Sequence, residues 1–309
     1  MRKFLLAFLA LPLFLMASVH NPVLILDDVN KDVLPRNFRS CRNPLPEGST
    51  VSREGLDTLR ISGSAQFSEL GLGALLKKID VIDQLIVVDL RGESHGFING
   101  NAVSWFVERN MINIGKSDNE IKRDELKLLD QVRAQQQITI TEVLSMINYD
   151  TIKDTSLLIL KVASVADEEE ITKKAHVGYK RFFVQDHKAP SDEQVDEFIS
   201  FVANKPANAW LHFHCKAGKG RTSTFMSLYD MLLNAKKLPF EAIMQRQQQL
   251  DGDYNVLHLG SPSTWKYPYT VARAEFLKRF YQYARENADD FKTSWTSYLK
   301  KNTAISSAK

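Results

Sequence analysis

The chain has 309 residues, of which 44% are hydrophobic and 25% are charged. This balance is typical of a folded globular protein and excludes a disordered, collagen-like or coiled-coil chain. Its 40 basic and 37 acidic residues leave a net charge of +3, which is too balanced for a general nucleic-acid-binding protein. The two cysteines, Cys41 and Cys215, are too few for a disulfide scaffold or a cysteine-rich zinc site.

The first 20 residues have the layout of an export signal. Met1–Lys3 is positively charged, Phe4–Met16 is a nearly continuous apolar run, and the small residues Ala17 and Ser18 follow. The run is shorter than the about 20 residues that a membrane-spanning helix needs. We therefore expect residues 1–20 to be a signal peptide and the mature protein to be periplasmic or secreted. A buried N-terminal helix and an uncleaved membrane anchor are the two alternatives.

Four apolar segments of the remaining chain predict strands. The runs at 84–89 and 209–214 are short and rich in β-branched or aromatic residues, which is typical of buried strands. Residues 138–141 and 157–165 are weaker strand candidates.

Helices are expected between and after these strands. Residues 112–137 are polar and prone to form a helix. Ser191 and Gln194 have the spacing of a capping box, which predicts a helix that runs to about residue 203. Apolar residues at helical spacing predict further helices at 221–236, with one apolar face, and around 276–284.

This alternation of strands and helices indicates an α/β fold. We expect one catalytic domain over residues 21–309. The block from about 102 to 175 has the least regular pattern and is the candidate for a small inserted subdomain.

Residues 209–223 (AWLHFHCKAGKGRTS) carry the clearest chemical motif, because a strand, a glycine loop and a helix follow one another. Glycines let consecutive backbone N–H groups point inward, and the helix N-terminus adds positive potential, so the loop is an anion cradle. Arg221 can offer phosphate a planar, bidentate pair of donors. The same field favours a thiolate at Cys215, which becomes a candidate nucleophile toward phosphorus. The hydroxyl of Thr222 or Ser223 can then hydrogen-bond the sulfur and help it leave.

Other interpretations of this loop fit less well. A nucleotide-binding loop of the Walker type needs Ser or Thr after Gly-Lys, and here Gly220 follows Lys219. A metal site of His212, His214 and Cys215 is disfavoured because neighbouring strand positions place the cysteine opposite the two histidines. A purely structural cysteine leaves the nearby cations unexplained. A disulfide between Cys215 and Cys41 would abolish activity.

A phosphatase also needs an acid that protonates the leaving oxygen. Asp186 is the candidate, because it lies on a loop closed by Pro190, between a strand-like run and the helix that begins after Ser191. Such a loop can close over the site. The alternative is that Asp186 only forms a turn.

The segment from Cys215 to Arg221 matches the Cys-x5-Arg signature of the protein tyrosine phosphatase superfamily. Residues 214–222 (HCKAGKGRT) and Asp186-His187 resemble the tumour-suppressor phosphoinositide phosphatase. Nearly the whole mature chain resembles the bacterial cysteine phytases, which are tyrosine-phosphatase-like inositol polyphosphatases. This second resemblance is carried by residues 34–39, 52–68, 89–105, 210–222, 246–247, 265–266 and 280–283.

The phytase resemblance implies a tyrosine-phosphatase-like fold, with a central, mostly parallel sheet flanked by helices and a small inserted partial β-barrel. It implies stepwise removal of phosphates from myo-inositol hexakisphosphate, without metal or organic cofactor. By position, Cys215 would be the nucleophile, Arg221 the phosphate clamp, Asp186 the general acid and Thr222 the group that assists the sulfur.

The same resemblance assigns substrate-binding positions. His187 lies beside the acid, and Arg39 and Lys266 match positions that bind peripheral phosphates. The loop would line the phosphate site with Lys216, Ala217, Gly218, Lys219 and Gly220. The two loop lysines suit a polyanionic substrate, although they could instead face solvent. The chain departs from the family at Asn110, where an aspartate can occur.

Inositol polyphosphates are therefore the expected small-molecule substrates, with no nucleic-acid partner and no membrane span in the mature protein. Two enzymatic alternatives stay open: a phosphoinositide lipid phosphatase, which the cationic loop favours, and a protein tyrosine phosphatase. A non-catalytic phosphate-binding module is disfavoured because Cys215, Arg221 and Asp186 occur together. His95 is expected to be a buried histidine with satisfied hydrogen bonds and no catalytic role.

Overall fold

The computed structural model describes residues 21–81, 84–147 and 151–307. The predicted signal peptide lies outside these residues. The strands are β1 (Val23–Asp28), β2 (Arg39–Ser40), β3 (Ile61–Ser64), β4 (Leu85–Asp89), β5 (His95–Ile98), β6 (Asn101–Phe106), β7 (Gln137–Ile147), β8 (Thr151–Lys161), β9 (Val165–Ala166), β10 (Gly178–Arg181) and β11 (Trp210–His214).

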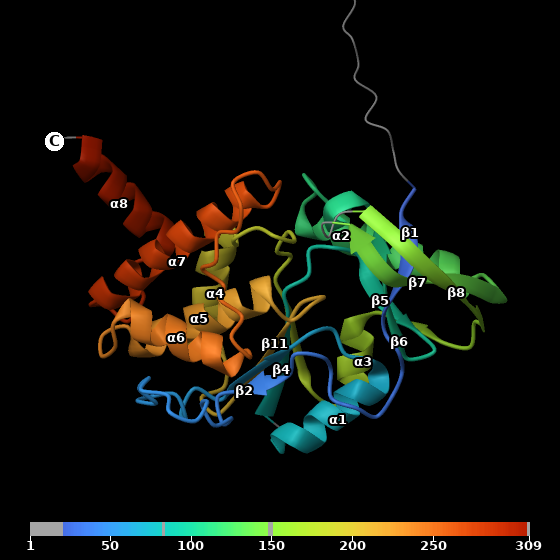
Figure 1. Cartoon of the computed structure of the whole chain (residues 1–309), viewed down its shortest axis with the longest axis horizontal. Coiled ribbons are helices and arrows are strands. Elements are labelled where there is room, and N and C mark those ends of the chain that lie inside the picture. Colours follow the sequence, from blue (N-terminus) through green and yellow to red (C-terminus); the bar gives the residue numbers. More distant parts are fainter. Residues whose placement is uncertain (1–20, 82–83, 148–150, 308–309) are drawn as a thin grey trace, which may run out of the picture.

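The helices are α1 (Glu69–Ile79), α2 (Asp118–Arg133), α3 (Glu168–Lys174), α4 (Asp192–Asn204), α5 (Gly220–Asn234), α6 (Phe240–Leu250), α7 (Tyr267–Glu286) and α8 (Trp295–Ser307), with a 3₁₀ turn, η2 (Glu108–Asn110). Helices α4 to α7 lie on one side of the molecule, and the sheet that contains β1 and β5 to β8 lies on the other side (Figure 1). Within the described residues, no helix is both long and apolar enough to cross a membrane.

The central sheet has the strand order β10-β4-β11-β3-β2. Its first four strands are parallel, and only β2 pairs in the antiparallel sense. Strands β4 and β11 confirm the strands predicted at 84–89 and 209–214. They are buried nearly throughout, as expected when helices cover both faces of a parallel sheet. The predicted α/β class with a mostly parallel central sheet is confirmed, and the loop after β11 lies at the carboxyl edge of that sheet.

Helix α5 confirms the predicted helix at 221–236, but it is buried on nearly every side. Phe225, Leu228 and Met231 are fully buried, and so is the polar Asp230. The helix packs against β3 and β11 on one side and against α6 and α7 on the other, which explains why a single apolar face is not visible in the structure.

The other helices follow the predicted pattern with shifted ends. Helix α4 begins after Ser191, whose side chain and that of Gln194 form the predicted capping box. Helix α2 is shorter than the predicted 112–137, because η2 and a turn precede it. Helix α7 is longer than predicted at its N-terminus, where a proline occupies the first turn, a position that tolerates it.

The second sheet has the strand order β8-β7-β1-β6-β5-β9. The strand candidates at 138–141 and 157–165 are parts of the longer β7 and β8 and of β9. This sheet also takes in β1 and β5, which lie before residue 102, so it extends beyond the range of about 102–175. The limits of an inserted subdomain and its partial barrel form stay predictions.

Candidate active site

The phosphate loop, residues 215–221, joins the end of β11 to the start of α5, as the sequence predicts. Gly218 has a φ of 70°, and a Cβ there would overlap the backbone of Ser64 and Ala65 at the end of β3. Only glycine therefore fits at this point, and the loop lies against the central sheet. Gly220 is also constrained, because a Cβ there would lie 3.0 Å from Arg273 Nη1.

Cys215 lies at the base of this loop and is buried. The Thr222 hydroxyl donates to its sulfur, with 3.2 Å between Oγ1 and Sγ. Cys41 and Cys215 are both free, so the disulfide considered from the sequence is not formed. The Thr222 hydroxyl is therefore placed where it can stabilise a thiolate at Cys215.

Arg221 is held at the loop by Glu93. Its Nη1 lies 2.6 Å from Glu93 Oε2 and its Nη2 lies 3.0 Å from Oε1, a bidentate pair. Burial alone would raise the pKa of Glu93, but the guanidinium groups of Arg221 and Arg91 hold it well below its usual range. The Nε atom of Arg221 is buried and makes no hydrogen bond. An anion in the loop could accept a bond from this donor.

Asp186 contacts the same guanidinium from the loop between β10 and α4. Its Oδ1 lies 3.2 Å from Arg221 Nη2, and Asn110 donates to its Oδ2 at 2.9 Å. Burial favours the neutral acid, but Arg221, His187 and the hydrogen bond from Asn110 together outweigh this effect and lower the pKa of Asp186 below its usual value. Asp186 is therefore a carboxylate at neutral pH while the loop holds no anion.

The two loop lysines each pair with a buried carboxylate. Lys216 Nζ lies 3.2 Å from Asp27 Oδ1, and Lys219 Nζ lies 3.0 Å from Asp251 Oδ1. Their side chains are 25% and 31% exposed, so neither simply extends into solvent. The sequence did not predict these carboxylate partners.

Arg39 lies beneath the phosphate loop, where its side chain is only 2% exposed. It donates to the Gly218 carbonyl oxygen at 2.7 Å and to Ser223 Oγ at 2.9 Å, and it pairs with Asp251 at 3.1 Å. This geometry makes Arg39 a support of the loop. The expected contact of Arg39 with a peripheral phosphate stays a prediction.

An aromatic and cationic rim lies beside Asp186. The indole ring of Trp265 contacts the His187 ring edge-on at 4.8 Å between centroids. Arg109 and Lys266 place their cationic groups 5.0 and 5.3 Å from the same indole ring. The structure therefore brings Lys266 and His187, two predicted substrate-binding residues, to one place. Arg109 and Trp265 were not predicted to take part in the site.

Comparison with known proteins identifies the family. Residues 88–233 match the family model of the PTP-like phytases, described as inositol hexakisphosphate. The solved PTP-like phytase of Bdellovibrio bacteriovorus is 36% identical, with a TM-score of 0.72, and the match covers 91% of this chain and 95% of that one. The chain belongs to the PTP-like phytase family.

Two longer relatives are matched by this chain over about half of their length. The PTP-like myo-inositol phosphatase of Mitsuokella multacida, solved with myo-inositol-(1,3,4,5)-tetrakisphosphate, is 35% identical with a TM-score of 0.85, and the match covers 92% of this chain and 48% of that one. The effector protein hopD2 of Pseudomonas syringae pv. tomato is 31% identical over 250 residues, 80% of this chain and 53% of that protein. The chain thus spans about half of both relatives.

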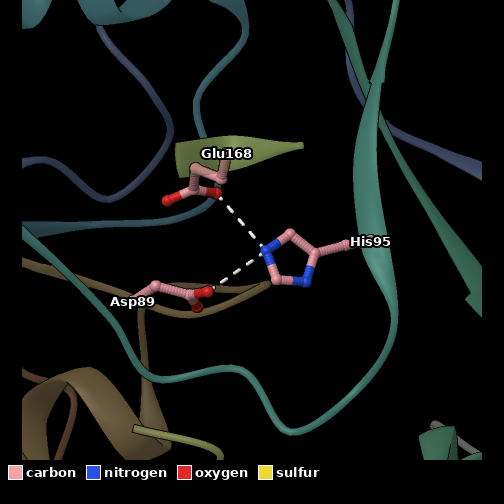
Figure 2. Close-up of side chains that lie close together, drawn as sticks. All are labelled: Asp89, His95 and Glu168. Atoms are coloured by element: carbon pink, nitrogen blue, oxygen red, sulfur yellow. Dashed lines mark ion pairs between the residues drawn. The ribbon is translucent and has the colours of Figure 1, made fainter. Parts of the chain in front are cut away.

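This family member also contains a buried ionic cluster behind the phosphate loop. Figure 2 shows Asp89, His95 and Glu168 pointing toward one another, with His95 Nε2 between the two carboxylates at 3.2 and 3.4 Å. Burial and the charge of Arg91 lower the pKa of His95, but the carboxylates of Asp89 and Glu125 more than compensate and raise it to about 10.

The donors around this cluster fit a protonated histidine better than a metal ion. The Tyr179 hydroxyl donates to Asp89 Oδ2 at 2.9 Å, and Arg181 Nε lies 3.1 Å from the same oxygen. His214 Nε2 lies 2.6 Å from Glu168 Oε1, and Gln66 Nε2 donates to Glu168 Oε2 at 2.8 Å. His95 is therefore a buried, charge-paired histidine. Its Nδ1 donates to the Glu93 carbonyl oxygen, as expected of a satisfied histidine, whereas Nε2 has ion-pair contacts but no hydrogen bond within the described residues.

Besides Arg109 and Trp265, sequence reasoning missed the roles of Glu93, Asp27 and Asp251 as partners of the loop cations. Glu93 follows the end of β4, where the carboxyl edge of a parallel sheet commonly carries functional groups, so its position offered a signal. The other two carboxylates come from distant segments, and no local pattern connects them to the phosphate loop.

Proposed function

We propose that the protein is a phosphatase that removes phosphates stepwise from myo-inositol hexakisphosphate and lower inositol polyphosphates through a cysteinyl-phosphate intermediate. The observation that carries the proposal is that the loop from Cys215 to Arg221 and the residue after it place a thiol and two hydrogen-bond donors together. Thr222 donates to the sulfur, and Arg221 keeps a buried Nε donor without a partner. Family membership and the inositol phosphate bound to the Mitsuokella relative support the choice of substrate.

In the first step, the Cys215 thiolate attacks phosphorus and the bond from phosphorus to the inositol oxygen breaks. Asp186 gives its proton to that leaving oxygen. The free protein holds Asp186 as a carboxylate through Arg221. A phosphate dianion that binds Arg221 would weaken this ion pair and add a like charge, and both effects raise the pKa of Asp186. Substrate binding would therefore load the acid with its proton.

In the second step, a water molecule attacks the phosphorus of the intermediate and the bond from sulfur to phosphorus breaks. The Asp186 carboxylate left by the first step accepts the proton of that water. The Thr222 hydroxyl, 3.2 Å from the sulfur, stabilises the departing thiolate. These steps use side chains and backbone donors alone, and we propose that no metal or organic cofactor takes part.

The cations around the phosphate loop suit a polyphosphorylated ring. Lys216, Lys219, Lys266 and His187 surround the loop or the acid, and Arg39 supports the loop from beneath. We propose that the first four meet peripheral phosphates of the substrate, which a lone phosphotyrosine does not offer. Export after removal of residues 1–20 is a further proposal, and mass spectrometry of the mature protein would test it.

A substrate panel tests the proposal. We expect phosphate release from phytate to exceed release from phosphoinositide vesicles and from a phosphotyrosine peptide, with no loss of rate in EDTA. Cys215→Ser should bind phytate and release no phosphate, with kcat reduced by at least about 10⁴-fold, because the nucleophile is absent. Turnover at the normal rate by this variant would remove Cys215 from the nucleophile role. A preference for vesicles would favour a lipid phosphatase.

A further inference from the structure

Strand β1 of the second sheet contains a bulge at Asp27. In its antiparallel pairing with β6, Leu26 lies opposite Val103 and Asp28 lies opposite Ala102, so Asp27 is the extra residue. A bulge changes the direction of a side chain from the normal alternation of a strand, and bulges are common beside active sites. The Asp27 carboxylate is fully buried.

The Asp27 carboxylate contacts three donors, of which Lys216 belongs to the phosphate loop. Lys216 Nζ lies 3.2 Å from Oδ1, Ser104 Oγ donates to the same oxygen at 3.0 Å, and Arg91 Nη1 lies 2.9 Å from Oδ2. Burial alone would raise the pKa of Asp27, but the cations of Lys216 and Arg91 lower it. The group is therefore a buried anion at neutral pH.

Within the described residues, both side-chain contacts of Lys216 come from the second sheet. Besides Asp27 in β1, its ammonium lies 5.5 Å from the centroid of the Phe106 ring at the end of β6. Lys216 follows Cys215 directly in the chain, so its backbone belongs to the phosphate loop. An ammonium group has three donors, so it can keep Asp27 and still accept an anion.

Lys219 provides a contrast on the opposite side of the phosphate loop. Its ammonium lies within reach of both the Asp251 carbonyl oxygen, at 3.2 Å, and the Asp251 carboxylate, at 3.0 Å. Asp251 also binds Arg39 and Ser223. Among the described residues, each lysine thus pairs with one carboxylate: Asp251 links Lys219 to the support beneath the loop, whereas Asp27 links Lys216 to the second sheet.

We propose that Asp27 is a positioning residue that holds Lys216 at the edge of the phosphate loop, where its ammonium binds a peripheral phosphate of the substrate. The proposal rests on the proposed function, because it requires a substrate with more than one phosphate. It gives the second sheet a direct part in substrate selection.

The test compares phytate with p-nitrophenyl phosphate, which carries a single phosphate. Asp27→Asn keeps the shape of the side chain and removes its charge. We expect KM for phytate to rise about tenfold with kcat unchanged, and kcat/KM for p-nitrophenyl phosphate to stay within about twofold. Lys216→Ala should weaken activity on phytate more than activity on p-nitrophenyl phosphate. The double variant should be no worse than Lys216→Ala, because Asp27 acts through Lys216.

Three outcomes would overturn the proposal. Equal losses on both substrates would make Asp27 a general support of the fold. Additive losses in the double variant would separate the two residues. A lower KM for phytate in Asp27→Asn would mean that the carboxylate restrains Lys216 from the substrate.

A second variant covers the case in which Asp27→Asn fails to fold. Phe106→Leu removes the aromatic ring beside Lys216 and should raise KM for phytate about two- to threefold, with p-nitrophenyl phosphate unchanged. No change in either KM would overturn the proposal. If the unaltered protein cleaves p-nitrophenyl phosphate and not phytate, the proposed function fails instead.

Discussion

Among the residues that the structure describes, four carboxylates contact the cations of the phosphate loop, and they form two groups. Asp27, Glu93 and Asp251, the buried carboxylate frame, are 0 to 1% exposed and come from β1, the segment after β4 and the end of α6. Asp186 is 22% exposed and lies on the loop between β10 and α4. The same chemical group can therefore fix a cation permanently or exchange a proton, and the surroundings decide which.

Among the four carboxylates, Asp186→Asn should have the largest effect on chemistry and the smallest effect on stability. We expect kcat on phytate to fall by about 10²- to 10⁴-fold, because the inositol oxygen then leaves without a proton. The loss should be smaller for p-nitrophenyl phosphate, whose leaving group needs less help. Steady-state kinetics with thermal unfolding of the same samples would measure both. A large loss of stability with normal kcat would mean that Asp186 has a structural role, like the buried carboxylate frame.

The same comparison predicts a pH dependence of kcat/KM. Because Arg221, His187 and Asn110 lower the pKa of Asp186 below its usual value, the protonated acid becomes scarcer in the free protein as the pH rises. The value of kcat/KM for phytate should therefore fall as pH rises, and the fall should already begin below the usual pKa of an aspartate, about 3.9. In Asp186→Asn this fall should be absent, and its persistence would assign it to another group.

Glu93→Gln should combine both kinds of loss. It removes the carboxylate that binds Arg221 at 2.6 Å and Arg91 at 2.9 Å, and it leaves two buried guanidinium groups with excess charge. Breaking such a pair costs about 3–5 kcal/mol of unfolding free energy, which urea denaturation would measure. Glu241→Gln, which changes an exposed glutamate in the first turn of α6, is a matched control with a small expected change. Equal stability of the two variants would contradict a structural frame.

His95→Gln should have the smallest effect on kcat, and its effect on stability extends the comparison to the cluster in Figure 2. The pKa of His95 is about 10 in the folded protein and near 6.5 when unfolded. Its protonation therefore stabilises the fold fully below pH 6.5, and this contribution is lost as pH rises toward 10. Urea denaturation should show this decline in the unaltered protein and a flatter profile in His95→Gln. Parallel profiles would mean that His95 is neutral.

The sequence by itself determined the phosphate loop. A strand, two glycines, an arginine and a helix follow one another within residues 209–223, and the form of the loop depends on neighbours along the chain. The capping box of α4 was predictable for the same reason, since Ser191 and Gln194 are three positions apart. The family resemblance followed from these local segments.

Only the tertiary structure decided which carboxylate faces which cation. Asp27 meets Lys216 because a bulge in the second sheet turns it toward the loop, and Asp251 meets Arg39 across more than half of the chain. Helix α5 is buried on nearly all sides because α6 and α7 cover its outer surface. Ion pairs and burial depend on how distant elements pack, and no pattern of neighbouring residues records that packing.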